Sequence, residues 1–191
     1  MTKSVMIVGV GGQGSLLASK LLGTLLVDCG YDVKVSEVHG MSQRGGSVVT
    51  YVRYGEQVAS PLIEKAGADV VLSFEKLEAL RYADYLKPDG VLLYSTQQIL
   101  PMPVITGAAE YPGDIDERLR SITSNLIAVD AVELAERAGG AKAANVVLLG
   151  VLARQLGIEK ERWIETIQKV VPAKFLEMNL KAFGYGYQKE S

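Results

Sequence analysis

The chain has 191 residues, of which 48% are hydrophobic and 22% are charged, and these fractions are close to the averages for globular domains. The length predicts a single domain over residues 1–191, and the composition excludes a largely disordered chain. Twenty Lys and Arg residues against 22 Asp and Glu residues give a net charge of −2, which provides no basic surface for non-specific binding to a phosphate backbone. We therefore expect a compact protein that does not bind nucleic acid.

The first part of the chain is expected to contain three strands and one helix. Residues 4–8 form a short apolar run that stops at Gly9, and leucines at helical spacing over residues 15–29 predict a helix that ends at Gly30. Residues 32–38 alternate polar and apolar side chains and predict a second strand, which would complete a βαβ unit. Residues 47–54 predict a third strand, followed by a tight turn at 55–56 and a short return strand at 57–59. We therefore expect a β-hairpin added to a mostly parallel sheet.

Strands and helices alternate in the middle of the chain, and helices dominate its end. Strand-like runs occur at residues 69–74, 91–95 and 126–129, with a helix at about 75–86 and a less regular stretch at 96–113. From residue 131 onward the pattern is nearly all helical, over residues 131–137, 143–156, 159–171 and about 173–183. This order predicts an α/β fold, a Rossmann-like three-layer arrangement with helices on both faces of the sheet and a helical C-terminal region.

A glycine-rich loop follows the first strand and precedes the first helix. Gly9, Gly11 and Gly14 have the spacing of a dinucleotide-binding motif, in which the start of the helix offers free N–H donors to an anion. Glu37 lies near the place of an acid that would bind a ribose, about 20 residues beyond the motif. The alternative is that the three glycines serve only the turn from strand to helix.

A second unusual loop, residues 39–46, follows the second strand. It contains His39, Arg44 and three glycines, where a βαβ unit normally resumes within about 2–6 residues. If strands 1 and 2 are neighbours in a parallel sheet, this loop adjoins the first glycine loop. Arg44 could then bind a phosphate or carboxylate through two hydrogen bonds, or it could simply pair with a local acid.

The chain lacks the residues of a self-sufficient enzyme. It has no Walker A loop, no nucleophile elbow and no convincing acid/base pair, and His39 and Cys29 are more simply explained as structural residues. One cysteine and one histidine cannot supply the ligands of an iron–sulfur cluster or a zinc site, so such a cofactor would have to lie on another chain. The longest uncharged apolar-rich stretch, residues 143–153, falls short of the ~20 residues that cross a bilayer. With a single cysteine and no secretory signal at the N-terminus, the expected location is the cytoplasm, with no membrane span.

The two loops together carry a family resemblance. Residues 9–14 (GVGGQG) followed by residues 37–47 (EVHGMSQRGGS) resemble the small, beta subunits of indolepyruvate:ferredoxin oxidoreductases, within the 2-oxoacid:ferredoxin oxidoreductase family. Residues 145–150 and 172–183 are similar to the C-terminal helices of its gamma-type domain, so the resemblance spans the chain. The first loop is shared with the pyruvate and 2-oxoglutarate branches, and the subtype depends on residues 39–43.

The resemblance implies a non-catalytic subunit of an enzyme that converts an aryl 2-oxoacid, coenzyme A and oxidised ferredoxin into an acyl-CoA, carbon dioxide and reduced ferredoxin. In such enzymes the large subunit is the partner that holds thiamine diphosphate and the iron–sulfur clusters, and coenzyme A is a co-substrate. We expect this chain to hold no cofactor alone, to be inactive alone, and to expose an apolar docking surface that includes its C-terminal helices and residues 185–187.

No residue is expected to be catalytic, and the two loops are expected to form one anion-binding or partner-facing cleft. The candidate residues are Gly9, Gly11, Gly12, Gln13, Gly14, Ser42, Gln43, Arg44, Gly45 and Gly46. Two alternatives remain, namely a free-standing NAD(P)-binding dehydrogenase or regulatory domain, and a scaffold whose loops bind only protein.

Overall fold

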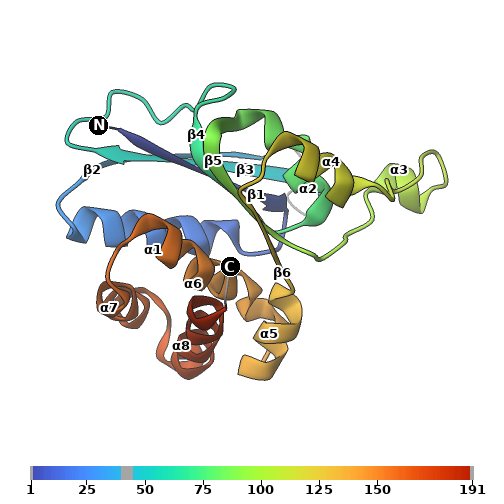
Figure 1. Cartoon of the computed structure of the whole chain (residues 1–191). Helices are drawn as coiled ribbons and strands as arrows, with labels where there is room; N and C mark the ends of the chain where they lie inside the picture. The colour runs from blue at the N-terminus through green and yellow to red at the C-terminus, as the bar shows by residue number, and fades with distance from the viewer. Residues whose placement is uncertain (1, 40–44, 190–191) are drawn as a thin grey trace.

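A six-stranded sheet lies between two layers of helices in the computed structural model, which describes residues 2–39 and 45–189 (Figure 1). The strands are β1 (Lys3–Val10), β2 (Asp32–His39), β3 (Ser47–Gly55), β4 (Ala68–Ser73), β5 (Leu86–Ser95) and β6 (Leu126–Val129), in the order β2-β3-β1-β4-β5-β6. β1, β4, β5 and β6 pair in parallel, whereas β3 is antiparallel to both of its neighbours. The predicted α/β fold with a mostly parallel sheet is confirmed.

The hairpin lies elsewhere than expected. β2 and β3 form it, so β3 lies between β1 and β2, and the first two strands are not neighbours. The prediction of a return strand at residues 57–59 is wrong, because these residues do not pair with another strand. Instead, this segment is held by hydrogen bonds to side chains of β2 and β3. The Val58 N–H donates to Asp32 Oδ2 at 2.7 Å, and Arg53 Nη1 donates to the Ser60 carbonyl at 3.0 Å.

One face of the sheet is covered by α1 (Ser15–Asp28), α5 (Ala131–Ala138), α6 (Ala144–Leu156), α7 (Lys160–Val170) and α8 (Ala173–Gln188), as Figure 1 shows. Residues 145–153 of α6 are all buried, because α6 lies between the sheet and α8. α8 runs five residues beyond its predicted end, so residues 185–187 lie inside this helix and are not an exposed apolar tail. Even α8, with 16 residues, does not reach a membrane-spanning length, and no helix in the described part of the chain is long and apolar enough to cross a membrane.

The other face carries α2 (Lys76–Arg81), a short 3-10 turn, η1 (Ala83–Tyr85), and α4 (Ile115–Ile122). The helix predicted over residues 75–86 breaks at Tyr82, and β5 begins at Leu86. α4 was not predicted. It buries Ile115 and Leu119, one helical turn apart. Lys76 Nζ joins the two helices by an ion pair with Asp116 at 2.8 Å.

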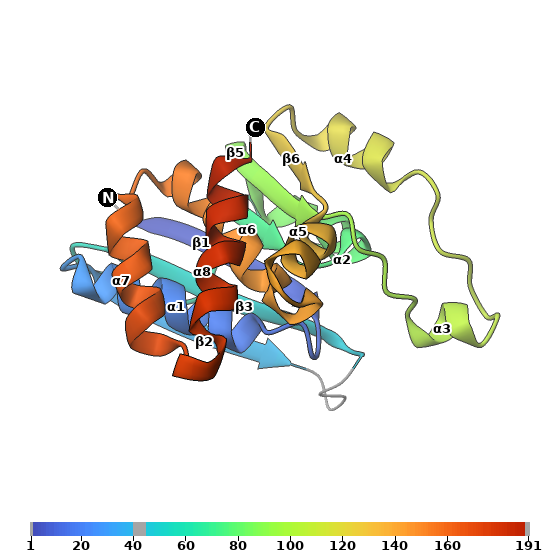
Figure 2. The same ribbon diagram turned by 90° about the horizontal axis from the view of Figure 1, so that it is seen from below.

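The topology places a crevice at the edge of the sheet where β1, β4, β5 and β6 end. α1 leaves β1 toward one face, and α2 leaves β4 toward the other face (Figure 1). Neighbouring strands whose helices diverge in this way leave an opening beyond their carboxyl ends, which is where open α/β sheets bind ligands. Seen from below, the loop after β1, the end of β2 and the start of β3 lie at this same edge (Figure 2).

Candidate functional site

Gln13 holds the first glycine loop in shape. Its Oε1 accepts a hydrogen bond from the Val10 N–H at 2.8 Å, and its Nε2 donates to the Phe74 carbonyl at 2.8 Å and to Gln97 Oε1 at 2.9 Å. A Cβ atom at Gly9 would lie 2.9 Å from Gln13 Oε1. Gly9 is therefore required by the packing of this loop against the end of β4.

Gly14 joins the first glycine loop to α6. Asn145, which is buried at the start of α6, donates from Nδ2 to the Gly14 carbonyl at 3.1 Å and accepts from the Val146 N–H at 2.9 Å. Gly14 has a φ of +86°, and a Cβ atom there would lie 2.4 Å from Asn145 Nδ2. The interpretation that these glycines serve a structural turn is thus supported at Gly9 and Gly14, which both make close internal contacts.

The end of the second loop lies beside the first, as expected, but for a different reason. The antiparallel pairing of β1 with β3 continues beyond the strands, so that the Gly11 N–H donates to the Gly46 carbonyl at 2.8 Å and the Gly45 N–H donates to the Gly11 carbonyl at 3.4 Å. The Gly11 N–H is therefore already used and does not face a ligand. Ser42, Gln43 and Arg44 lie outside the described residues.

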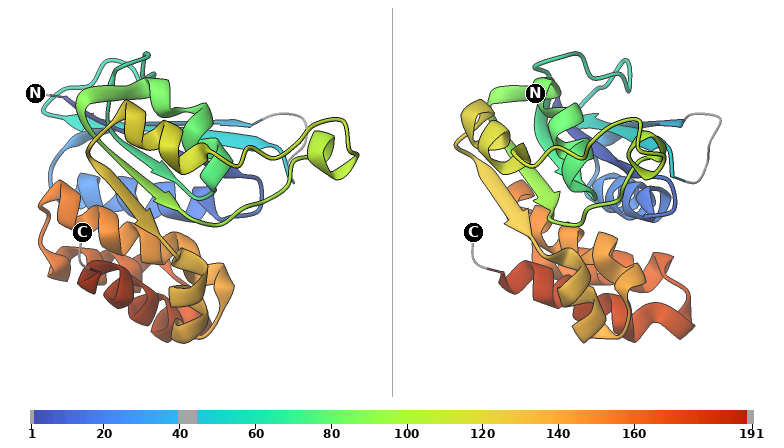
Figure 3. Two further views of the ribbon diagram at one scale, coloured as in Figure 1. Left: turned by 45° about the vertical axis from the view of Figure 1, so that its right-hand side comes forward. Right: turned by 90° about the vertical axis from the view of Figure 1, so that its right-hand side faces the viewer.

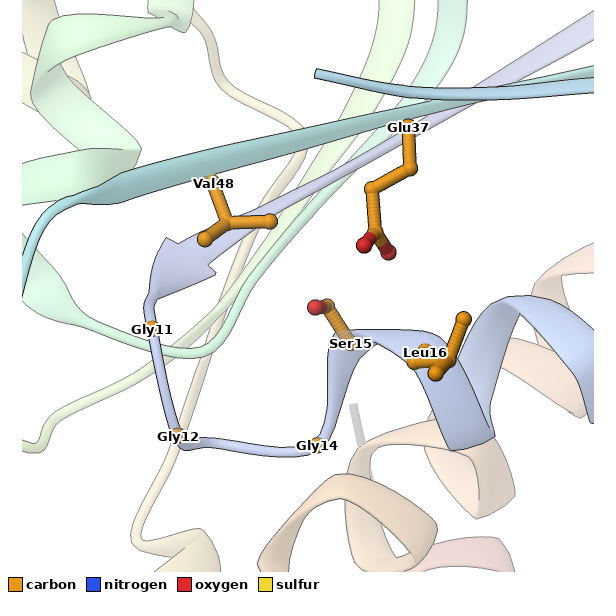
Figure 4. A pocket seen from close by; sticks show the side chains of 7 residues that line it. All are labelled: Gly11, Gly12, Gly14, Ser15, Leu16, Glu37 and Val48. Atoms are coloured by element: carbon orange, nitrogen blue, oxygen red, sulfur yellow. The ribbon is translucent and has the colours of Figure 1, made fainter. Parts of the chain in front are cut away.

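The Glu37 cavity opens on one side of the first glycine loop and has a volume of about 420 Å³. It is lined by Gly11, Gly12, Gly14, Ser15, Leu16, Glu37 and Val48 (Figure 4). The Glu37 carboxylate points from β2 toward the first turn of α1, and its Oε2 accepts a hydrogen bond from Thr50 Oγ1 at 3.2 Å. Because β3 separates β2 from β1, Glu37 lies one strand farther from the glycine loop than the ribose-binding acid of a dinucleotide fold. Its negative charge also disfavours a phosphate on this side.

The Lys142 cavity lies on the other side of the loop, has a volume of about 660 Å³, and is lined by residues from the ends of β4 and β5 and from the starts of α1 and α6. The lining residues used below are Gly12, Gly14, Gln97, Lys142 and Asn145. Neither α1 nor α6 has a side-chain cap or an acidic residue in its first turn. Two helix N-termini with partial positive charge, together with the exposed Lys142 ammonium, make this side suited to an anion.

Sequence reasoning did not identify Gln97, Lys142 or Asn145 as site residues. Each of them lies more than 80 residues from the first glycine loop. Asn145 begins the segment 145–150 that shares in the family resemblance, but that segment indicated only a helix, and Gln97 and Lys142 belong to no motif. Topology alone could have indicated Gln97, because it follows the end of β5 at the same edge.

Two buried carboxylates, Glu75 and Glu78, anchor the surrounding segments. Glu75 caps α2 by accepting from the Glu78 N–H at 2.8 Å, and it accepts from the Tyr111 hydroxyl at 2.8 Å. Burial, together with this hydrogen bond, raises the pKa of Tyr111 well above its usual value. Glu78 accepts a hydrogen bond from Ser47 Oγ, the first residue of β3, and pairs with Arg81 at 3.0 Å. Glu78 therefore fixes the start of β3, where the second loop ends, and Glu75 fixes Tyr111. Within residues 2–39 and 45–189, no group of three or more His, Cys, Asp or Glu side chains could hold a metal ion.

The fold is an open α/β sheet in which two glycine loops meet beyond the carboxyl ends of the parallel strands, the place where sheets of this class bind ligands. Residues 4–189 match the family model described as pyruvate ferredoxin/flavodoxin oxidoreductase, and the chain belongs to this family. The resemblance identified from the two loops is thereby confirmed.

Individual relatives agree with this assignment. Indolepyruvate oxidoreductase subunit IorB of Thermococcus kodakarensis is 43% identical over 189 residues, which cover 96% of this chain and 93% of that protein. The crystal structure of pyruvate oxidoreductase subunit PORC from Thermotoga maritima shares the fold, with a TM-score of 0.75, 22% identity and coverage of 98% of this chain and 96% of that chain. Ketoisovalerate oxidoreductase subunit VorA of Methanothermobacter thermautotrophicus is 29% identical over 187 residues, which cover 95% of this chain but 35% of that protein. These matches do not favour a free-standing dehydrogenase.

Proposed function

We propose that this chain is the small subunit of an indolepyruvate:ferredoxin oxidoreductase. The enzyme would convert an aryl 2-oxoacid and coenzyme A into an acyl-CoA and carbon dioxide, and would pass the two electrons released to ferredoxin. The observation that carries this proposal is the 43% identity to an indolepyruvate oxidoreductase subunit over nearly the full length of both chains. The whole of residues 1–191 would act as one gamma-type unit.

In this proposal the chemistry occurs on a large partner subunit that holds thiamine diphosphate and the iron–sulfur clusters. The cysteine content of this chain supports placing the clusters on the large subunit, because one cysteine cannot supply the thiolates that an iron–sulfur cluster requires. The small subunit would contribute surface and charge to the assembled site but no catalytic residue.

The cleft formed by the two glycine loops and the Lys142 cavity would be the part of this chain that faces the active site. The helix N-termini of α1 and α6 and the Lys142 ammonium would receive an anionic group of coenzyme A or an acidic group of the partner. Gly11, Gly45 and Gly46 would brace the loops against each other. Ser42, Gln43 and Arg44 belong to the proposed face on the basis of the sequence.

The test is to produce the chain with and without the large subunit of the same source, and to measure ferredoxin reduction with indolepyruvate and coenzyme A. We expect a colourless, inactive small chain and an active complex.

Lys142→Glu should lower kcat/KM for coenzyme A by about tenfold, which corresponds to about 1.4 kcal/mol. Lys3→Glu serves as the matched control and should leave kcat/KM unchanged, because Lys3 is an exposed lysine at the start of β1, at the far end of that strand from the glycine loop.

Arg44→Ala should likewise lower the activity of the complex, with little effect on folding. Turnover by the chain alone, or tight binding of NAD(H) to it in calorimetry, would contradict the proposed function.

A further inference from the structure

An arm extends from the fold at the edge where β5 ends. We define the arm as residues 99–111, which include the one-turn helix α3 (Met102–Ile105), and Figures 1 and 3 show it projecting away from the rest of the fold. No residue from 100 to 110 is buried. The side chains of Leu100, Met102 and Ile105 are 49%, 63% and 61% exposed.

The composition of the arm is unusual for an exposed segment. No charged residue occurs between Asp89 and Glu110, so the arm has no charge except at Glu110, near its end. Exposed loops are normally polar, whereas the centres of protein interfaces are depleted in charged residues and enriched in methionine and aromatic residues. An ordered apolar tip of this kind on a free surface indicates an interaction site.

The arm is also held in one shape. Glu75, which is buried, accepts hydrogen bonds at the same Oε1 atom from the Ile99 N–H at 3.0 Å and from the Tyr111 hydroxyl at 2.8 Å, so one carboxylate oxygen binds both ends of the arm. Within the arm, the Pro103 carbonyl accepts from the N–H groups of Ala108 at 2.8 Å and Ala109 at 3.0 Å. A segment that is already ordered loses little conformational entropy on binding, which favours association.

We infer that this arm docks the chain onto the large subunit, by inserting Leu100, Met102 and Ile105 into an uncharged apolar hollow on that subunit. This inference rests on the proposed function. The arm starts from the same edge as the glycine loops, so a single partner could cover both. In the VorA relative, the part that is similar to this chain makes up about a third of a longer protein. That part is therefore covalently joined to further protein in VorA, and in the proposed complex the large subunit would take the place of that further protein.

A second copy of this chain is the other conceivable occupant. The hollow between α1 and β2, of about 610 Å³, includes Val27, Val33 and Val35 but also Lys20, Asp28 and Lys169. Asp28 and Lys169 pair with each other at 2.8 Å, and an uncharged tip would strip water from this ion pair and from Lys20 without replacing the lost hydrogen bonds, which is costly. The large subunit is therefore the favoured partner, and self-association becomes an outcome of the test.

The experiment compares Met102→Asp and Ile105→Asp with Leu62→Asp in complexes with a tagged large subunit. Leu62 is the matched control, because it is 59% exposed and lies in the loop between β3 and β4 at the opposite edge of the sheet. Each arm variant should weaken the small-to-large affinity at least tenfold, with an unchanged melting temperature of the small chain, whereas Leu62→Asp should bind like the wild type. Amides of residues 99–111 should exchange hydrogen more slowly in the wild-type complex than in the free chain.

Other results would separate the two proposals. If the wild type binds the large subunit and both arm variants bind equally well, the proposed function stands and the docking role of the arm is overturned. If the free chain dimerises and Met102→Asp abolishes only the dimer, the arm serves self-association and the inference is wrong. If the wild type itself does not bind the large subunit, the proposed function fails and the inference fails with it.

Discussion

Gly12 and Gly14 stand two residues apart in the first glycine loop, and both have positive φ angles, of +105° and +86°. Only Gly14 faces another side chain, because a Cβ atom there would lie 2.4 Å from Asn145 Nδ2, whereas nothing lies within 4 Å of a Cβ atom at Gly12. Gly12→Ala should therefore cost only the backbone strain, about 1–2 kcal/mol. Gly14→Ala should cost about 3 kcal/mol or more, because the clash and the strained hydrogen bond to Asn145 add to the strain. Urea denaturation of the two variants measures the difference.

A double mutant separates the clash from the strain at Gly14. Asn145→Ala removes the amide that a Cβ atom at position 14 would meet, so it should destabilise the Gly14→Ala protein less than it destabilises the wild type. Equal effects in the two backgrounds would mean that the backbone angle alone explains the requirement for glycine.

The spacing of Gly9, Gly11 and Gly14 predicted the strand, the loop and the helix correctly, but it could not distinguish their roles. A glycine that meets Gln13, one that pairs with Gly46 and one that meets Asn145 look alike in a sequence. Asn145 is 131 residues from Gly14, and a contact at that separation follows from tertiary packing, which spacing does not encode.

At the scale of elements, α6 and α8 approach each other closely through glycine. A Cβ atom at Gly186 would lie 1.9 Å from the Val147 carbonyl oxygen, and backbone cannot move aside without displacing α8. Gly186→Ala should therefore destabilise the protein by about 3 kcal/mol or more. Gly184, in the same helix, has nothing within 4 Å, so Gly184→Ala should stabilise the protein by about 0.5–1 kcal/mol through its higher helix propensity. Thermal unfolding of both variants checks the prediction, and similar effects for the two would contradict it.

Sequence patterns predicted most of the segments that form strands and helices, but not the order of the strands in the sheet. Alternating side chains identified β2 and β3 as strands, but the same alternation suits any partner, so the insertion of β3 between β1 and β2 could not be predicted. The expected adjacency of the two loops nevertheless holds, because an antiparallel β3 brings the end of the second loop to the end of β1. The last five residues of α8, residues 184–188, were missed, since glycine and tyrosine are poor helix formers in isolation, whereas close packing against α6 favours them here.

At the scale of the whole molecule, three tyrosines make stability depend on pH in alkaline solution, namely Tyr54 and Tyr94 in the core and the partly buried Tyr111. Burial, with smaller effects of Tyr31 and Asp69, raises the pKa of Tyr54 to about 12. Burial also raises the pKa values of Tyr94 and Tyr111, and each donates a hydrogen bond to a carboxylate, Asp116 and Glu75 respectively. All three should remain protonated in the folded state at a pH where an unfolded tyrosine, with a pKa of about 10, has lost its proton.

The sign follows from proton linkage. Between about pH 10 and 12 the unfolded chain binds fewer protons than the folded chain at Tyr54, so the free energy of unfolding falls as the pH rises, by up to about 1.4 kcal/mol per pH unit for that one residue. Tyr54→Phe keeps the ring and its edge-on contact with Tyr31 at 5.3 Å but removes the titrating group, so it should reduce this slope. Urea denaturation followed by far-ultraviolet circular dichroism from pH 9 to pH 12 avoids the absorbance change of tyrosine itself. The stability of Tyr54→Phe at pH 7 gives the effect of losing the hydroxyl group alone. If the free energy of unfolding of Tyr54→Phe fell with pH as steeply as that of the wild type, Tyr54 would ionise as readily in the folded protein as in the unfolded chain, and the prediction would be wrong.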